Sequence, residues 1–168
     1  IFVRNLNPFG CALLNMDEIG YSSLEFIEFY KKLLEYVIDI NQKGIYIEES
    51  LASLLLTRIL TPFSTGIVDL QFPAGTGISG VIYDYDGNVY PSDEARMLAQ
   101  MNDHEFCMGN VSRNSYREVF YDSIIDLAKQ TCVESLPGCV DCAFQVYCGI
   151  DPIRNYAIHG DIIGYRPT

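Results

Sequence analysis

The sequence lacks the segments that would place a protein in a membrane or direct it out of the cell. No uninterrupted apolar run in the 168 residues approaches the ~20 residues that a membrane-spanning helix needs. The N-terminus has neither the basic segment nor the apolar core of a secretory signal. Hydrophobic residues make up 49% and charged residues 20% of the chain, a balance that excludes disordered and low-complexity proteins. We therefore expect a soluble, cytoplasmic protein with no membrane partner.

Basic residues are also scarce. The chain has 11 Lys and Arg against 22 Asp and Glu, and its formal net charge of −11 repels phosphate backbones. We therefore expect no nucleic-acid partner. The chain starts at Ile1 and stops at Arg166-Pro167-Thr168 without a closing element, which favours a fragment of a longer protein.

Six cysteines are present, and three of them are clustered near the C-terminus. Cys139-Val-Asp-Cys142 is a CxxC motif, and Cys148 follows it at a short distance. Gly138 and Gly149 flank the cluster and allow the backbone to turn tightly around a central ion. Without a secretory signal, thiols at this spacing are metal or iron–sulfur ligands more often than disulfide partners. A redox-active CxxC motif and simple buried thiols are the alternatives.

A fourth ligand would complete a tetrahedral site, and the chain offers three candidates. Cys132 lies upstream at the end of an expected helix, Asp151 follows Cys148 at a knuckle-like spacing, and His159 is farther along. An Asp carboxylate suits zinc better than a soft iron–sulfur centre. The two remaining cysteines, Cys11 and Cys107, are expected to be small buried hydrophobic residues.

The first third of the chain reads as one strand followed by helices. Residues 1–6, Ile-Phe-Val-Arg-Asn-Leu, are mostly apolar and are predicted to form a buried strand. Ser22 with Glu25 has the form of a capping box at the start of a long helix that ends near residue 43, and a second helix is expected over 48–60. The composition then becomes rich in Gly and Tyr, which predicts a domain boundary near residue 66.

A hairpin is expected after this boundary. Residues 81–85 and 88–90 flank Asp86-Gly87, a dipeptide that supplies the positive φ angles of a tight turn. The glycines at 75, 77 and 80 satisfy the GxGxxG pattern, but a strand follows them where a dinucleotide site needs a helix. We therefore expect no dinucleotide binding there.

Two further helices are expected in this second region. Ser92 can cap a short helix that ends near Met101. Another helix is expected to begin at Ser115, with Glu118 three residues later. Its inward-facing residues are expected to be Val119, Phe120, Ile124, Leu127 and Ala128.

Several segments resemble a known family. They are Gly87-Asn-Val-Tyr-Pro-Ser92, Met108-Gly-Asn-Val111, Leu136-Pro-Gly-Cys-Val-Asp-Cys142 and Tyr147-Cys-Gly149. Together they resemble the C-terminal SPASM region of radical SAM peptide-modifying enzymes, and the phrases at 90–97 and 160–167 are most similar to the maturases of His-Xaa-Ser peptide systems. The match covers residues 74–167. The resemblance implies an α+β chain: residues 1–66 as the last strand and helices of a partial (β/α) barrel, and 67–168 as a SPASM-like domain of a hairpin, helices and a cysteine-rich loop.

The sequence departs from the family pattern at several positions. Ala74 and Ser92 stand where the family carries the first two cluster cysteines, and Pro152 stands where a later one is expected. The resemblance therefore implies that the first auxiliary cluster is lost, because Ala cannot ligate and Ser is a weak substitute. It also implies that Cys139, Cys142 and Cys148 bind one auxiliary [4Fe–4S] cluster, with Asp151 or Cys132 as the possible fourth ligand.

The function that the resemblance implies depends on residues outside these 168. The radical SAM motif CxxxCxxC, which holds the cluster that cleaves S-adenosylmethionine, does not occur in the chain. The chain would be the auxiliary-cluster part of an enzyme that modifies a ribosomally made peptide, and its partners would be that peptide and the rest of the enzyme. The alternative is a non-catalytic binding or scaffold module, with structural zinc or no metal in the 139–148 loop. A secreted disulfide protein is a third, weaker interpretation.

Overall fold

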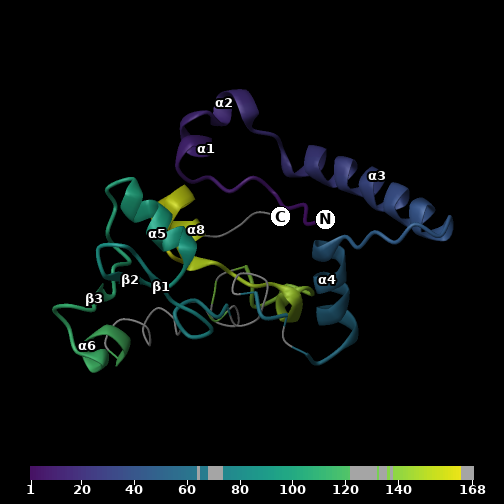
Figure 1. The fold of residues 1–168 in the computed structure, drawn as a ribbon. Coiled ribbons are helices and arrows are strands. Elements are labelled where there is room, and N and C mark those ends of the chain that lie inside the picture. Colours follow the sequence, from purple (N-terminus) through teal and green to yellow (C-terminus); the bar gives the residue numbers. More distant parts are fainter. Residues whose placement is uncertain (64, 68–73, 122–131, 133–135, 137, 164–168) are drawn as a thin grey trace. The chain divides into compact units, whose positions relative to one another are not determined.

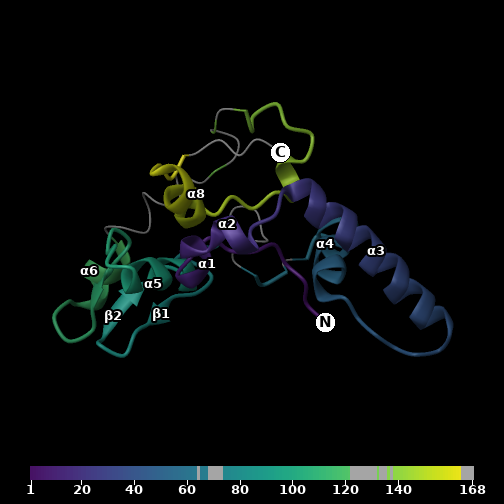
Figure 2. The ribbon, with the colours of Figure 1, turned by 90° about the horizontal axis from the view of Figure 1, so that it is seen from above.

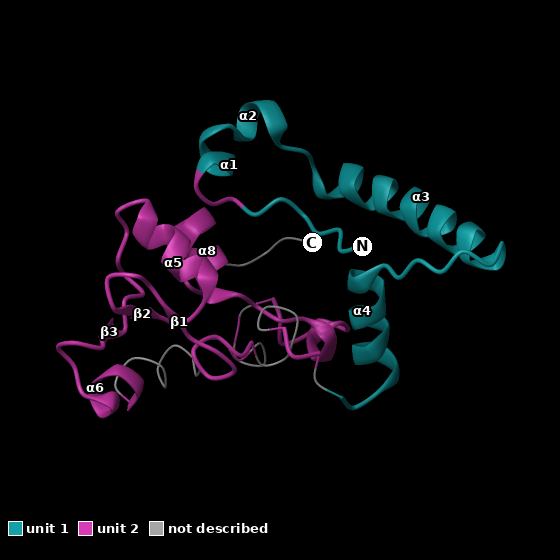
Figure 3. Ribbon diagram, viewed as in Figure 1, with its two compact units in different colours: residues 1–7, 11–63 teal, residues 8–10, 64–168 magenta. Residues whose placement is uncertain are grey.

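The computed structural model describes residues 1–63, 65–67, 74–121, 132, 136 and 138–163. The chain divides into two compact units, shown in Figure 3: unit 1 comprises Ile1–Asn7 and Cys11–Phe63, and unit 2 comprises Pro8–Gly10 and Ser64–Thr168. Helices and a small antiparallel sheet make up the described elements, so the expected α+β class is confirmed. The barrel and SPASM-like assignments stay predictions. None of the described helices is long and apolar enough to cross a membrane.

Unit 1 is helical, and its two main helices begin and end close to where the sequence predicts (Figure 1). The four helices are α1 (Cys11–Leu14), α2 (Met16–Ile19), α3 (Ser23–Gln42) and α4 (Ser50–Leu60). The capping box of α3 is formed: the Glu25 amide donates to Ser22 Oγ (3.2 Å), and the Ser22 amide donates to the Glu25 carboxylate (2.7 Å). Two amide groups that a helix start leaves without partners are thereby satisfied.

The strand predicted for residues 1–6 is wrong. These residues form no regular element, and Ile1 and Phe2 are 57% and 48% exposed. The segment is held by the loop before α4 instead: the Ile1 amino group donates to the Glu48 carbonyl (2.7 Å), and the Ser50 amide donates to the Ile1 carbonyl (2.7 Å). An apolar run becomes a strand only where a neighbouring strand completes its ladder, and none of the described strands pairs with this segment.

Unit 2 is built on a three-stranded antiparallel sheet. Its strands are β1 (Ile82–Tyr83), β2 (Asn88–Tyr90) and β3 (Gly109–Asn110), in the order β1-β2-β3. The predicted hairpin is confirmed, with Gly87 at φ +84° in its turn. Strand β3 was not predicted, because two residues beginning with glycine carry no alternation signal.

The remaining described elements of unit 2 are short helices. They are α5 (Asp93–Gln100), α6 (Tyr116–Tyr121), the 3-10 helix η3 (Gln145–Tyr147) and α8 (Pro152–His159). Ser92 Oγ caps α5 by accepting from the Ala95 amide (3.4 Å), as predicted. Ser115 and Glu118 exchange hydrogen bonds at the start of α6, and Ile124, Leu127 and Ala128 lie outside the described residues. Residues 75–80 form turns and an isolated bridge, with no helix.

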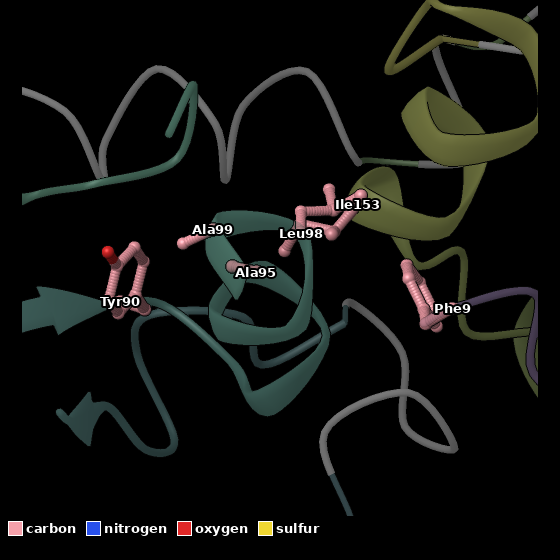
Figure 4. Close-up of a cluster of buried hydrophobic side chains, with 6 residues drawn as sticks. All are labelled: Phe9, Tyr90, Ala95, Leu98, Ala99 and Ile153. Carbon is pink, nitrogen blue, oxygen red and sulfur yellow. The ribbon is translucent and has the colours of Figure 1, made fainter. Parts of the chain in front are cut away.

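Buried side chains cover both faces of this small sheet. Helix α5 contacts β2 and α8, and Figures 1 and 2 show these elements side by side. The largest cluster, drawn in Figure 4, comprises Phe9, Tyr90, Ala95, Leu98, Ala99 and Ile153. A second cluster comprises Val89, Met108 and Val119, and a third comprises Leu136 and Ile150. The neighbours Val89 and Tyr90 therefore point to opposite faces, as alternation along a strand requires.

Candidate functional site

The clustered cysteines lie on a loop made of consecutive tight turns. Gly138 enters it at φ +76°, a conformation that favours glycine. The Cys139 amide donates to the Leu136 carbonyl (3.1 Å), and the Cys142 amide donates to the Cys139 carbonyl (3.1 Å). The CxxC motif is therefore a hydrogen-bonded turn, which brings the backbones of its two cysteines close together.

Gln145 continues this series of turns to the third cysteine. Its amide donates to the Cys142 carbonyl (3.1 Å), while its side-chain Nε2 donates to the Cys139 carbonyl (3.2 Å). The Cys148 amide then donates to the Gln145 carbonyl (3.2 Å). Gln145 thus ties both ends of the CxxC turn to the segment that carries Cys148, one end through its side chain and the other through its backbone amide.

The thiols of this loop interact electrostatically. Burial raises the pKa of the Cys139 thiol, and the neighbouring Cys148 and Cys142 raise it further. The Cys139 thiolate is therefore disfavoured when no cation is nearby. A bound metal ion reverses this balance, because its positive charge stabilises thiolates.

The environment of the loop differs from one thiol to the next. Cys139 packs against Leu136 and Ile150, so its position is fixed by the third hydrophobic cluster. Cys142 is half-buried and Cys148 is exposed, and all six cysteines carry free thiols. The loop is thus anchored at one cysteine and open to solvent at another.

The donor chemistry fits a thiolate-binding ion or cluster through three ligands. Cys142 and Cys148 both lie within electrostatic reach of Cys139, and thiolates are the ligands that structural zinc and iron–sulfur clusters take. Among the residues that the structure describes, no group of three or more His, Cys, Asp or Glu side chains is already arranged around one point. Binding would therefore require the side chains to converge.

The candidate fourth ligands have different roles in the fold. Asp151 is 6% exposed and caps α8, where its Oδ1 accepts from the Ile153 amide (3.0 Å). His159 is the last residue of that helix, and Cys132 is half-buried. The sequence carried the signal for this cap, because Asp before Pro at a helix start is a favoured combination. A ligand role for Asp151 or Cys132 stays a prediction.

The two positions that lack the family's cysteines have structural roles. Ala74 is 4% exposed and part of the core. Ser92 is 8% exposed and caps α5. To bind a cluster, a thiol at position 74 would have to leave the core, and a thiol at position 92 would have to give up the cap of α5.

One of the two isolated cysteines differs from expectation. Cys107 is half-buried, and its Sγ donates to the Gly109 carbonyl (3.6 Å). Cys11 is exposed, so its expected burial is wrong: it lies on α1, a four-residue helix with no buried side chain. The sequence also gave no indication that the buried Tyr90 hydroxyl would contact His104 Nδ1 (3.3 Å).

Comparisons with known proteins leave the family open. No family model, curated protein or solved structure matches the chain.

Proposed function

We propose that this chain is the auxiliary-cluster, SPASM-type part of a radical SAM enzyme that modifies a ribosomally made peptide, most similar to the maturases of His-Xaa-Ser systems. The observation that carries the proposal is the loop at 138–148, in which successive turns connect Cys139, Cys142 and Cys148. These three thiolates bind one [4Fe–4S] cluster. The resemblance of residues 74–167 to the family supplies the rest of the argument.

The residues of this chain would hold the cluster and determine where solvent reaches it. A bound cluster supplies electron relay or ordering of the substrate. Cys139 is the anchored ligand, because Leu136 and Ile150 fix its position. Cys148 is the ligand open to solvent. Cleavage of S-adenosylmethionine belongs to the rest of the enzyme, since these 168 residues contain no CxxxCxxC motif.

A second candidate function is a non-catalytic module that holds structural zinc or no metal. The capping role of Asp151 favours it, because a buried carboxylate fixed at a helix start suits a structural role. The burial of Ala74 and the capping role of Ser92 also favour it, because both replace expected cluster cysteines. In this alternative the third hydrophobic cluster keeps the loop folded.

Metal analysis separates the two candidates. The full chain is purified without oxygen, and iron, acid-labile sulfide, zinc and the visible absorption spectrum are measured. Iron and sulfide in cluster stoichiometry support the maturase proposal, whereas stoichiometric zinc or a folded, metal-free protein supports the structural module. Cys142→Ser should abolish metal binding and loosen residues 138–152, since binding energy at such sites is folding energy. Cys11→Ser is the matched control, because that thiol is exposed in unit 1.

The fourth ligand needs a variant that separates ligation from capping. Asp151→Asn keeps an oxygen that caps helices as well as Asp does, but it removes the charged ligand. If Asp151 ligates, this variant loses metal affinity while its melting temperature without metal stays unchanged. If metal content and affinity equal those of the wild type, Asp151 is a cap only, and Cys132→Ser becomes the next test.

A further inference from the structure

The two edges of the sheet in unit 2 differ in how their backbone groups are used. Strand β3 forms one edge, and the Asn110–Asn114 turn closes it. The Asn110 amide donates to Asn114 Oδ1 (2.9 Å), and the Asn114 amide donates to the Asn110 carbonyl (2.9 Å). Asn110 and Asn88 form a non-hydrogen-bonded pair of the antiparallel ladder. The next pair along is the hydrogen-bonded one, because the Val111 amide donates to the Gly87 carbonyl (2.9 Å). The N–H and C=O of Asn110 therefore face outward and are satisfied there.

Strand β1 forms the other edge, and no described strand lies beyond it. The Asp84 amide donates to the Asn88 carbonyl (2.9 Å), so the pair at 84 and 88 is hydrogen-bonded. Tyr83 pairs with Val89 one position along, and alternation makes this a non-hydrogen-bonded pair. The N–H and C=O of Tyr83 therefore point away from β2, toward the open edge. Tyr83 is 59% exposed.

The charges near this edge determine which kind of peptide would bind there. Residues 74–121 contain seven Asp and Glu against three Arg, and no Lys. Asp84 and Asp86 lie at the hairpin turn beside β1, while Asp93 is paired with Arg96 (2.8 Å). Tyr85 is 95% exposed next to them. An acidic turn beside an exposed aromatic ring attracts cationic side chains by Coulomb and cation–π interactions.

We propose that the open edge of β1 binds an extended, lysine-rich peptide as a fourth strand. The N–H and C=O of Tyr83 supply the main-chain hydrogen bonds, and Asp84 and Asp86 attract the lysine side chains. This binding goes beyond the proposed function and does not rest on it, because no residue of the cysteine loop takes part. It holds equally for a cluster-binding chain and for a metal-free one.

The test uses the full chain and a labelled synthetic peptide of alternating lysine and threonine. Fluorescence anisotropy measures binding, and hydrogen exchange measures protection of the Tyr83 amide. We expect saturable binding that weakens with salt, together with protection of that amide on peptide addition. A peptide with glutamate in place of lysine should not bind, and a backbone N-methylated lysine peptide should bind at least about tenfold more weakly.

Two kinds of variant separate the backbone contribution from the charge contribution. Tyr83→Pro removes the outward N–H while leaving the bond between Asp84 and Asn88, and it should weaken binding by about tenfold. Asp84→Asn with Asp86→Asn keeps the oxygens that accept from the backbone amides of Tyr85 and Asn88, but it removes two charges and the bond from Asn88 Nδ2 to Asp86. This double variant should bind several-fold more weakly and with less salt dependence. Asp161→Asn is its matched control, since Asp161 accepts a similar local bond from the Ile163 amide.

Several results would overturn the proposal. Equal binding of the glutamate peptide would remove the charge argument, and unchanged affinity of both kinds of variant would place the peptide elsewhere. Protection of the Tyr83 amide in the free chain at low concentration would mean that the edge is already covered. Protection that rises with protein concentration, without peptide, would identify a second copy as the occupant.

Discussion

The two units are stabilised in different ways. Unit 1 contains the long helices, yet Val37 is its only buried hydrophobic residue among those the structure describes. Leu24 on α3 and Leu60 on α4 are 74% and 73% exposed, and an open apolar hollow of about 670 Å³ lies between these helices. The described elements of unit 2 are short, but they enclose three buried clusters. The length of the helices and the extent of the packed core are therefore separate properties in the described part of this chain.

Polar contacts replace a core in unit 1, and Glu49 is their centre. This residue is 4% exposed, and its carboxylate accepts from the amides of Val3 (3.1 Å) and Ala52 (2.7 Å). It also accepts from the Leu51 amide and the Tyr30 hydroxyl. One side chain thereby caps α4 and ties the N-terminal segment and α3 to it.

The largest expected difference between the units comes from truncating an aliphatic side chain in each. Ile153→Ala in unit 2 should lower the free energy of unfolding by about 2–5 kcal/mol, because the residue is fully buried in the largest cluster. Ile38→Ala on α3 is the matched change in unit 1 and should stay within about 0.5 kcal/mol, because that side chain is 56% exposed. Urea denaturation followed by circular dichroism measures both. Equal losses would contradict the comparison.

In unit 1, the substitution of a buried polar residue should cost more stability than the substitution of an exposed aliphatic one. Glu49→Ala should destabilise unit 1 by about 1–3 kcal/mol, because it leaves the Tyr30 hydroxyl and the Val3 amide without their acceptor. Hydrogen exchange at the Leu51 and Ala52 amides reports the loss at the start of α4. Glu48→Ala is the control, since Glu48 is exposed. If the Leu51 and Ala52 amides exchange at the same rate in both variants, the polar contacts of Glu49 do not stabilise unit 1.

Helix caps sharpen the comparison at a smaller scale. Ser92→Ala and Ser22→Ala each remove a cap worth about 1 kcal/mol. The loss of the cap at Ser92 should lower the free energy of cooperative unfolding of unit 2, because α5 is packed in its core. The loss at Ser22 should only fray the first turn of α3. Residue-resolved hydrogen exchange distinguishes these outcomes, and Ser→Asp at each position should restore the wild-type pattern.

The smallest expected effect is a pH dependence at the start of α4 in unit 1. Burial alone would raise the pKa of Glu49, but hydrogen bonds from Tyr30, Ala52, Val3 and Leu51 outweigh it and lower the pKa below its ordinary value. A lowered folded-state pKa contributes stability that is present above the unfolded-state pKa of about 4.3 and is lost as pH falls through the folded-state value. The protection factors of the α4 amides, which are exchange rates corrected for the intrinsic effect of pH, should therefore fall on acidification below pH ~4. Glu49→Gln should remove this dependence, and an unchanged profile would contradict the assignment.

Local signals in the sequence predicted much of the secondary structure. Capping residues marked α3 and α5, and Asp86-Gly87 marked the hairpin, because these signals act within a few residues. The strand at 1–6 could not be predicted correctly, since a strand depends on a partner strand outside its own segment. The sequence identified the three thiols of the loop. It could not indicate that Gln145 links their turns, nor that Asp151 is engaged as a cap.

The unequal edges of the sheet limit how copies of this chain can assemble. Where both edges of a sheet are open, strand addition can repeat without end and produce fibres. In unit 2 the Asn110–Asn114 turn occupies one edge, so pairing between copies through described strands is restricted to β1. Two copies that met in this way would each use the one open edge of the described sheet. Growth would then stop at a symmetric pair, which protects the protein against fibre formation.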